Sequence, residues 1–491
     1  MSKITRYGYL IDRRQTDPEL LEKIKIELTL CPRQPPAYAH LKRSVPIHFY
    51  QEQENYLAVP KYYGLAKLGP PARNLLEESN YPMQDVRFTG TLRPRQHEIA
   101  RKLINGLKEH RGGLLVAYCG IGKTVLAIYL ACHFRLKTLF IVHKTFLKNQ
   151  VRERILANTN VRDVGVLQGS RAEADHAFVV GMTQSLIRHD YPALDDFGMV
   201  IIDEVHHMAA QHFSRVLQKV SARYLLGLSA ENTRNDGLYK VLHWYLGPLL
   251  HEEPQRANEK VIVKRFFFRT VHQQAHEILI NRYTHEPDQT AMVNRLVALD
   301  TRNRFIHMVL KILYRMGRKT LCLTGRLSQI EHFRKKLEKY NVGCYIGGLS
   351  EEKLAISAGK QIILGTYHMA QEGLDIPDLN VVVLATPKTA VRQSIGRILR
   401  RETYEINPMI IDLVDKNAVF KRQARLREYY YHRHAFQVED YHITDDESPD
   451  QKEIGIQDTQ KLRKILESVQ KKSRVTYIYQ RIDPESLDFV S

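Results

Sequence analysis

The sequence is poor in cysteine and tryptophan, and it has no long uninterrupted apolar run. It contains 5 cysteines and 1 tryptophan among 491 residues, and no two cysteines have C-x-x-C spacing. This scatter supports neither a disulfide framework nor a zinc ribbon, and it favours an intracellular, reducing compartment. The longest apolar stretch, residues 113–134, is interrupted by Lys123 and by glycines, so it does not predict a membrane span. The first residues lack the apolar core of a signal peptide.

Acidic residues are outnumbered by basic ones. Lys and Arg total 73 and Asp and Glu total 54, which gives a formal net charge of +19. Such an excess favours a polyanionic partner, with nucleic acid preferred over an acidic membrane surface or a merely basic enzyme. The hydrophobic content of 43% and charged content of 26% exclude a disordered or fibrous chain.

Two long segments alternate short β-rich apolar runs with helical stretches. This alternation predicts parallel sheets with helices on both faces. We therefore expect an α/β protein with two tandem parallel-sheet lobes and smaller flanking parts. The expected divisions are an N-terminal accessory domain at 1–85, lobe 1 at 86–255, an inter-lobe segment at 256–300, lobe 2 at 301–420, and a basic, aromatic helical tail at 421–491.

A glycine-rich loop follows an apolar strand and opens a helical run at residues 117–124, which read A-Y-C-G-I-G-K-T. Glycines let backbone N–H groups turn around a β-phosphate, and the helix N-terminus adds its positive dipole end. Lys123 is expected to neutralise the β- and γ-phosphates, and Thr124 to ligate Mg²⁺. The alternative is an ordinary strand–helix turn. The strict pattern has Gly in place of Ala at the first position, but the tight turn lies later in the loop. The predicted nucleotide contacts here are Ala117, Gly120, Gly122, Lys123 and Thr124.

Two carboxylates, Asp203 and Glu204, follow the apolar strand at 200–202. A side chain at the C-terminal end of a parallel strand faces the ligand crevice. We expect Asp203 to hold Mg²⁺ through water, and Glu204 to orient and deprotonate the attacking water. An isolated acidic pair after a strand is usually a surface turn, but its position downstream of a phosphate loop favours catalysis.

Two arginines, Arg397 and Arg400, are spaced i, i+3 and share one helix face in the second α/β unit. Such a pair is often only a solvated face. With a phosphate loop elsewhere in the chain, we expect both guanidinium groups to reach the γ-phosphate across a cleft and stabilise transition-state charge.

Together these motifs make residues 90–415 resemble the superfamily 2 helicases of the DExD/H-box class. The A-Y-C-G-I-G-K-T loop is similar to motif I, in which Ala at the first position is usual, and D-E-V-H at 203–206 is similar to motif II. Residues 226–230, L-G-L-S-A, resemble motif III, which couples ATP to the nucleic-acid channel. The remaining matches are R-P-R-Q at 93–96, the motif V elements at 365–367 and 372–377, and motif VI at 393–400.

The resemblance implies two RecA-like lobes with ATP and Mg²⁺ in the cleft between them, and a nucleic-acid strand across both lobes. It adds three groups of candidate residues to those derived above. The further nucleotide contacts are Gln96 (to adenine), Gly373 and Asp375; the coupling residues are His206, Ser229 and Ala230; and the nucleic-acid contacts are Lys144, Thr145, Thr183, Thr324, Arg326 and Thr366.

A narrower resemblance is to the XPB-like group and to helicases of large cytoplasmic DNA viruses, including the poxvirus transcript-release type. Residues 300–303, 317–320, 373–377 and 56–64 carry it. It implies DNA rather than RNA as the strand, RNA polymerase or a transcription complex as a partner, and a host-cytoplasm or virion location. The alternatives are a translocase that releases transcripts or proteins without unwinding, an RNA helicase, and a non-enzymatic nucleic-acid-binding scaffold.

Two features leave the class pattern or remain open. After Ser229 and Ala230 the class continues Thr-Pro, whereas this chain has Glu231 and Asn232. A carboxylate near the phosphates is expected to repel ATP or weaken coupling, which affects unwinding more than hydrolysis. The basic, aromatic run at 425–434 is either a stacking surface for bases or an amphipathic helix packed on lobe 2.

Overall fold

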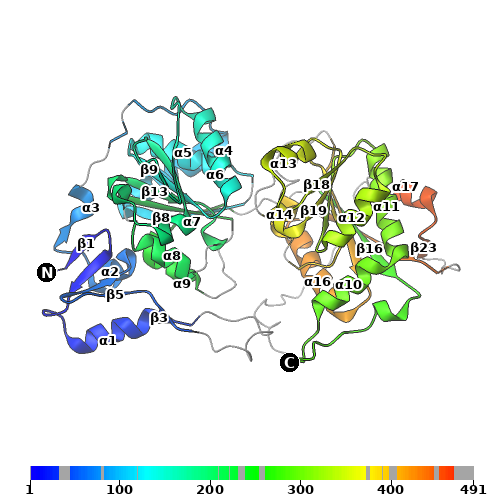
Figure 1. Ribbon diagram of the computed structural model, residues 1–491, viewed down its shortest axis with the longest axis horizontal. Helices are drawn as coiled ribbons and strands as arrows, with labels where there is room; N and C mark the ends of the chain where they lie inside the picture. Colours follow the sequence, from blue (N-terminus) through cyan, green and yellow to red (C-terminus); the bar gives the residue numbers. More distant parts are fainter. Residues whose placement is uncertain are drawn as a thin grey trace.

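The computed structural model shows two α/β lobes side by side, with a small N-terminal unit against the first lobe (Figure 1). This arrangement confirms the predicted α/β class with two parallel sheets. The structure describes residues 2–31, 45–78, 82–83, 85–118, 120–207, 210–220, 222–230, 238–253, 260–371, 376, 378–389, 391–396, 406–446 and 453–468.

Lobe 1 is built on an 8-stranded sheet in the order β11-β10-β12-β9-β13-β14-β8-β15. All neighbouring strands pair in parallel except the edge pair β10–β11. The central strands are apolar throughout because helices cover both faces of the sheet. The strands are β8 (Gly112–Ala117), β9 (Thr138–Val142), β10 (Gly165–Gln168), β11 (Arg171–Ala172), β12 (Phe178–Met182), β13 (Met199–Ile202), β14 (Tyr224–Ser229) and β15 (Leu249–Glu253).

The side chains of β9 show how this sheet forms two cores. Leu139 and Ile141 pack into one hydrophobic layer, and Phe140 and Val142 pack into the layer on the other face. The alternation follows from the two-residue period of a strand. The helices that supply the two layers are α4 (Pro94–His110), α5 (Lys123–Phe134), α6 (Thr145–Asn158), α7 (Thr183–Arg188), α8 (Ala210–Leu217) and α9 (Tyr239–Leu246).

Lobe 2 has a second 8-stranded sheet, in the order β18-β19-β17-β20-β21-β16-β22-β23, with every pair parallel. Its strands are β16 (Ile262–Arg269), β17 (Thr320–Thr324), β18 (Val342–Tyr345), β19 (Ile362–Thr366), β20 (Val381–Leu384), β21 (Met409–Asp415), β22 (Gln437–Thr444) and β23 (Glu453–Gly455). Its helices are α10 (Gln289–Ala298), α11 (Asp300–Arg315), α12 (Leu327–Lys336), α13 (Glu351–Ala358), α14 (Tyr367–Gln371), α15 (Arg392–Gly396), α16 (Ala418–Arg433) and α17 (Thr459–Glu467).

Two of the predicted boundaries are wrong for lobe 2. Strand β16 lies in the segment predicted to join the lobes, and it pairs with β21 and β22 inside the second sheet. The predicted helical tail also contains β22 and β23. Two ion pairs connect β16 to β22. Lys264 contacts Glu439 at 2.7 Å, and Arg265 contacts Asp440 at 2.6 Å. Lobe 2 therefore includes residues before 301 and residues after 420, on both sides of its predicted limits.

The N-terminal unit carries a sheet in the order β5-β6-β2-β1-β7 and rests on lobe 1. The ring of Trp244, on α9, lies 6.0 Å from the Phe49 ring and 5.6 Å from the Tyr63 ring. These aromatic contacts belong to a hydrophobic core that the unit shares with lobe 1. The elements are β1 (Lys3–Thr5), β2 (Gly8–Asp12), α1 (Pro18–Glu27), β3 (Thr29–Leu30), β4 (Ile47–His48), β5 (Gln51–Glu52), β6 (Tyr56–Val59), α2 (Lys61–Leu68), β7 (Arg73–Asn74) and α3 (Leu75–Glu78).

The basic, aromatic run of the tail forms helix α16, which packs on lobe 2. Tyr431 is fully buried and its hydroxyl donates to Asp412 at 2.9 Å, and Arg427 makes a two-bond pair with the same carboxylate. Of the three neighbouring tyrosines, Tyr429 is exposed. The packed-helix interpretation of this run therefore holds for Arg427 and Tyr431.

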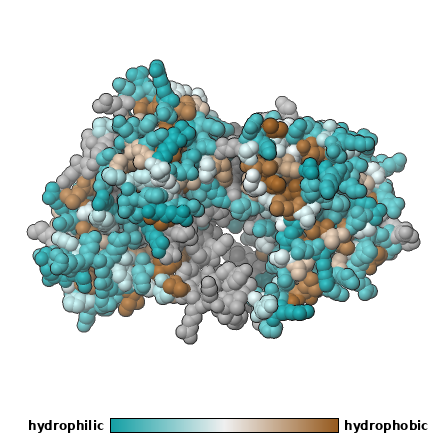
Figure 2. All heavy atoms as spheres, viewed as in Figure 1, coloured by the Kyte–Doolittle hydropathy of each residue, from teal (hydrophilic) through white to brown (hydrophobic). Residues whose placement is uncertain are grey.

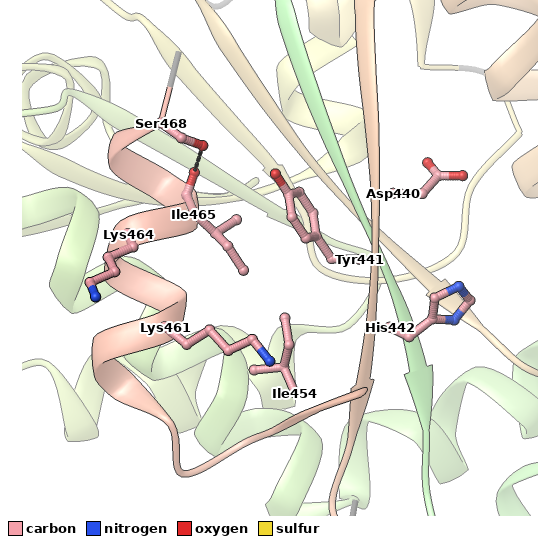
Figure 3. Close-up of a pocket in the computed structure, with 8 residues that line it drawn as sticks. All are labelled: Asp440, Tyr441, His442, Ile454, Lys461, Lys464, Ile465 and Ser468. Carbon is pink, nitrogen blue, oxygen red and sulfur yellow. Dashed lines mark hydrogen bonds between the residues drawn. The ribbon is translucent and has the colours of Figure 1, made fainter. Parts of the chain in front are cut away.

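Helix α17 closes the far side of lobe 2. Between it and β22 lies an open hollow of about 380 Å³, lined by Asp440, Tyr441, His442, Ile454, Lys461, Lys464, Ile465 and Ser468 (Figure 3). The face of the molecule in Figure 2 is mostly hydrophilic, with apolar areas scattered over both lobes. Among the residues that the structure describes, none of the helices is both long enough and apolar enough to cross a lipid bilayer.

We expect Arg427→Leu to destabilise lobe 2, because it leaves the buried carboxylate of Asp412 without its guanidinium partner. Breaking a buried pair in this way typically costs about 3–5 kcal/mol. Denaturant unfolding of the full chain measures the loss. The matched control is Arg463→Leu, whose exposed pair with Glu467 at 2.7 Å should contribute under about 1 kcal/mol. Equal losses of unfolding free energy in the two variants would contradict the role of the Arg427–Asp412 pair in the stability of lobe 2.

Candidate nucleotide and nucleic-acid site

The glycine-rich loop lies at the C-terminal end of β8, and helix α5 begins at Lys123. Gly120 and Gly122 both adopt left-handed backbone conformations, with φ of 100° and 88°. The side chain of Lys123 folds back into the loop, where its Nζ donates to the carbonyl of Ala117 at 3.0 Å. The loop thus has the turn that the sequence predicted, with the cation inside it.

Gln96 connects helix α4 to this loop. Its Oε1 accepts from the backbone N–H of Arg93 at 2.8 Å, and its Nε2 donates to the carbonyl of Ile121 at 2.8 Å. The side chain is 4% exposed. The residue predicted to read adenine therefore also holds the phosphate loop against the start of α4.

The acidic pair follows β13 at the same edge of the sheet. Asp203 is buried, and its Oδ1 accepts from the backbone N–H of Glu204 at 3.0 Å. Burial, helped by the negative charge of Glu204, raises the pKa of Asp203, whereas the cations Lys123 and Arg154 lower it. Glu204 has a positive φ of 51°, a strained conformation for a residue with a side chain. Such strain is typical of residues that a site holds in place for function.

A short polar chain leads from Glu204 to motif III. Nδ1 of His206 lies 3.4 Å from Oε2 of Glu204 and 3.0 Å from Oγ of Ser229. Ser229 is the last residue of β14 and is fully buried. The structure therefore brings together the predicted catalytic Glu204 and two of the predicted coupling residues. Ala230, which follows Ser229 in the sequence, is also buried.

One residue of this site was missed by the sequence motifs. Arg154, on helix α6, donates from Nη1 to Oγ1 of Thr124 at 3.0 Å. Its charge also acts on Asp203. No motif includes Arg154, because it lies in the middle of a polar helix and its spacing from the phosphate loop follows only from the packing of α6 on α5.

Several predicted residues lie outside the described part of the chain. They are Arg397, Arg400, Gly373, Asp375 and Glu231, so their roles stay predictions. Helix α15, which leads toward the two arginines, is described, and Ser394 and Ile395 in it are fully buried.

The predicted nucleic-acid contacts divide into two groups. Thr183 and Thr324 are buried, and their hydroxyls donate to the carbonyl of Val142 at 3.0 Å and to Oε1 of Gln329 at 2.6 Å. Thr183 begins α7 and Thr324 ends β17, and both hydroxyls are bonded inside the protein, while their contact with the nucleic-acid backbone stays a prediction. Arg326 is likewise bonded within lobe 2, to Asn294, Thr290 and Gly325.

Three predicted contacts lie at the C-terminal edges of their sheets. Thr145 is exposed, and Lys144 and Thr366 are partly exposed. Lys144 is the N-cap of α6, Thr145 is its first residue, and Thr366 ends β19. His368, on α14, was not predicted, but it lies close enough to Lys144 for an electrostatic effect between the lobes. Partial burial, then the charges of Lys144 and Lys388, lower the pKa of His368. The two lobes thus face each other here with basic groups.

The residues at the first lobe's edge fit Mg²⁺–ATP. The loop has two left-handed glycines that leave room for phosphates, Lys123 supplies a cation, and Thr124 and Asp203 are oxygen donors of the kind that Mg²⁺ takes. Asp203 shares its surroundings with the cations Lys123 and Arg154, which favour its ionised form.

Comparisons with known proteins agree with these observations. Residues 89–234 match the family described as "Type III restriction enzyme, res subunit". A protein of Acanthamoeba polyphaga mimivirus, named as an ATP-dependent RNA helicase, is 47% identical over 95% of this chain and 91% of its own length. A DNA 3'-5' translocase of the XPB type from Sulfurisphaera tokodaii is 23% identical over 76% of this chain and 92% of its own length. In fold, a fragment described as the HsdR subunit of a Vibrio vulnificus type I restriction enzyme has a TM-score of 0.52 and 16% identity, covering 73% of this chain and 70% of that one.

We expect Gly122→Ala to weaken nucleotide binding. A methyl group there would lie 2.4 Å from Nε2 of Gln96 and would stand on a left-handed backbone. Both effects disturb the phosphate loop, so the Kd for a fluorescent ATP analogue should rise about tenfold, or about 1.4 kcal/mol.

The control is Gly169→Ala, which has the same left-handed strain, with φ of 59°, but no atom within 4 Å of the added methyl. Its nucleotide affinity should match that of the unmodified chain. If both variants bind the analogue equally well, the hydrogen bond from Gln96 to the loop has no part in nucleotide binding.

Proposed function

Since the chain belongs to the superfamily 2 helicases and is an ATP-hydrolysing enzyme, we propose that it is a motor that uses Mg²⁺–ATP at the edge of lobe 1 to move along a nucleic-acid strand lying across both lobes. The observation that carries the proposal is the linkage at the C-terminal edge of the first sheet. The charges of Lys123, Asp203 and Glu204 act on one another there, and Nδ1 of His206 lies 3.4 Å from Oε2 of Glu204 and 3.0 Å from Oγ of Ser229.

In this proposal each residue has a defined task. Lys123 binds phosphate, and Glu204 holds the attacking water and takes its proton. Thr124 and Asp203 would hold Mg²⁺, which supplies Lewis-acid polarisation of the phosphate oxygens when bound. Arg397 and Arg400 would approach the same phosphates from lobe 2 and stabilise transition-state charge.

The strand is proposed to bind where the two lobes face each other. Lys144 from lobe 1 and Lys388 from lobe 2 supply positive charge there, on either side of His368, whose pKa both lysines help to lower. Contacts between cations and phosphates give affinity without sequence choice, which suits a motor that moves along any sequence. The net charge of +19 supports the same conclusion.

We propose DNA as the strand, with release of transcripts from a transcription complex as the task and host cytoplasm or virion as the location. The relation to an XPB-type DNA translocase supports DNA. The second candidate is an RNA strand, which the name of the mimivirus relative favours. A transcript-displacement assay on a stalled transcription complex, run beside a strand-unwinding assay, separates release from unwinding.

Turnover of ATP should rise with nucleic acid and depend on Glu204. We expect stronger stimulation by DNA than by RNA, and Glu204→Gln should lower the stimulated rate by about 10²–10⁴, the usual contribution of a general base. The assay compares no nucleic acid, single-stranded DNA, duplex DNA and single-stranded RNA.

In the same assay, stimulation led by RNA would overturn the DNA assignment and leave the motor in place. Lys123→Ala should abolish nucleotide binding. If that variant kept stimulated turnover, the phosphate loop would be wrongly assigned.

Ser229→Ala should separate hydrolysis from movement. It removes the hydroxyl at 3.0 Å from His206, while Lys123, Asp203 and Glu204 stay in place. We expect the ATPase rate to change by less than about threefold and translocation to fall by about tenfold, the size of one lost hydrogen bond in a buried network. Movement is measured by displacement of a protein block from the strand.

The matched control is Ser214→Ala, at a buried serine of helix α8 in the same lobe. Loss of ATPase and movement in equal proportion in Ser229→Ala would show that this serine supports hydrolysis itself rather than coupling.

A further inference from the structure

Helix α6 brings a fixed positive charge to the place where the metal donors lie. Nη1 of Arg154 donates to Oγ1 of Thr124 at 3.0 Å. Arg154 is half-buried, and α6 packs directly on α5, the helix that carries Thr124. The guanidinium is therefore bonded to one of the two residues that would hold Mg²⁺.

This contact conflicts with metal binding. Mg²⁺ takes oxygen lone pairs, and a guanidinium only donates, so both cations approach the same hydroxyl oxygen. Two positive charges at such short range repel each other strongly in a buried site. An arginine stays charged in proteins, so loss of a proton does not relieve the conflict. The guanidinium has to move when the metal arrives.

We propose that Arg154 is a positioning residue that competes with Mg²⁺ for the Thr124 hydroxyl and gives up its bond to Thr124 when Mg²⁺–nucleotide binds. This inference rests on the proposed Mg²⁺–ATP site. Displacement of Arg154 adds an energetic cost to metal binding, so the residue sets how much Mg²⁺ the protein requires.

A simpler role makes a different prediction. If Arg154 were only a tether between α5 and α6, its loss would lower the stability of the protein and leave the Mg²⁺ requirement unchanged. If Arg154 competes with Mg²⁺ for the Thr124 hydroxyl, the loss of Arg154 makes Mg²⁺ binding easier. The direction of the change in Mg²⁺ requirement therefore separates the two roles, and it does not depend on turnover.

The experiment titrates Mg²⁺ against binding of a fluorescent ATP analogue by the full chain. The neutral variants Arg154→Gln and Arg154→Met both keep the length of the stem, so the titration needs only one of them to fold. Each should reach half-saturation at an Mg²⁺ concentration lower by about threefold or more, because the competing charge is gone. Arg154→Lys keeps the charge and should stay close to the unmodified chain.

A matched control lies on the same helix. Arg152 pairs with Asp163 at 3.5 Å, and Arg152→Gln should leave the Mg²⁺ requirement unchanged. Thermal melting without nucleotide checks that each variant is folded, and it should show a lower melting temperature for the neutral Arg154 variants than for the unmodified chain.

Two results would overturn these claims separately. An unchanged or higher Mg²⁺ requirement in a folded neutral Arg154 variant would overturn the inference and leave the nucleotide site in place. If the unmodified chain binds the analogue equally with and without Mg²⁺, the proposed metal site itself fails.

Discussion

Burial of both faces of a parallel sheet is the constraint on which the rest of this molecule depends. The central strands β8, β13 and β14 lie between two helical layers, so they are almost free of polar side chains along their length. Chemistry begins where each strand ends, at the phosphate loop, at Asp203 and at Ser229. Because parallel strands end at one edge, these three endings meet without any long-range pairing of polar residues. The site is a consequence of the sheet.

The same burial creates the electrostatic problem that the site's cations address. Asp203 lies away from solvent beside Glu204, and both effects oppose its ionised form. Lys123 and Arg154 act in the other direction. A buried carboxylate that is to hold a metal needs such neighbours when the metal is not there, since an isolated buried charge is very costly. The cations thus belong to the stability of lobe 1 as much as to its chemistry.

How much the sequence predicted follows from how local each feature is. The glycine-rich turn, the acidic pair after β13 and most strands of both lobes follow from short patterns, and the structure has these features. The binding of phosphate by the turn stays a prediction. Strand β22 was missed because its polar sequence, Q-V-E-D-Y-H-I-T, gives no apolar run, and its partners in β16 lie 175 residues away. Thr183 and Thr324 were predicted to contact a bound nucleic-acid strand because of the family resemblance. Only the packed structure shows that their hydroxyls are bonded inside the protein.

Charge also links the two lobes. Lys144 in lobe 1 acts on His368 in lobe 2, which Lys388 approaches from its own lobe. Like charges that face each other across a cleft resist its closure. A row of phosphates laid across both lobes reverses this effect, because each phosphate attracts the basic groups of either side. On this argument the strand helps to bring the lobes together. Stimulation of ATP hydrolysis by nucleic acid would then follow from electrostatics. His206 and Ser229 would couple Glu204 to the edge of the sheet.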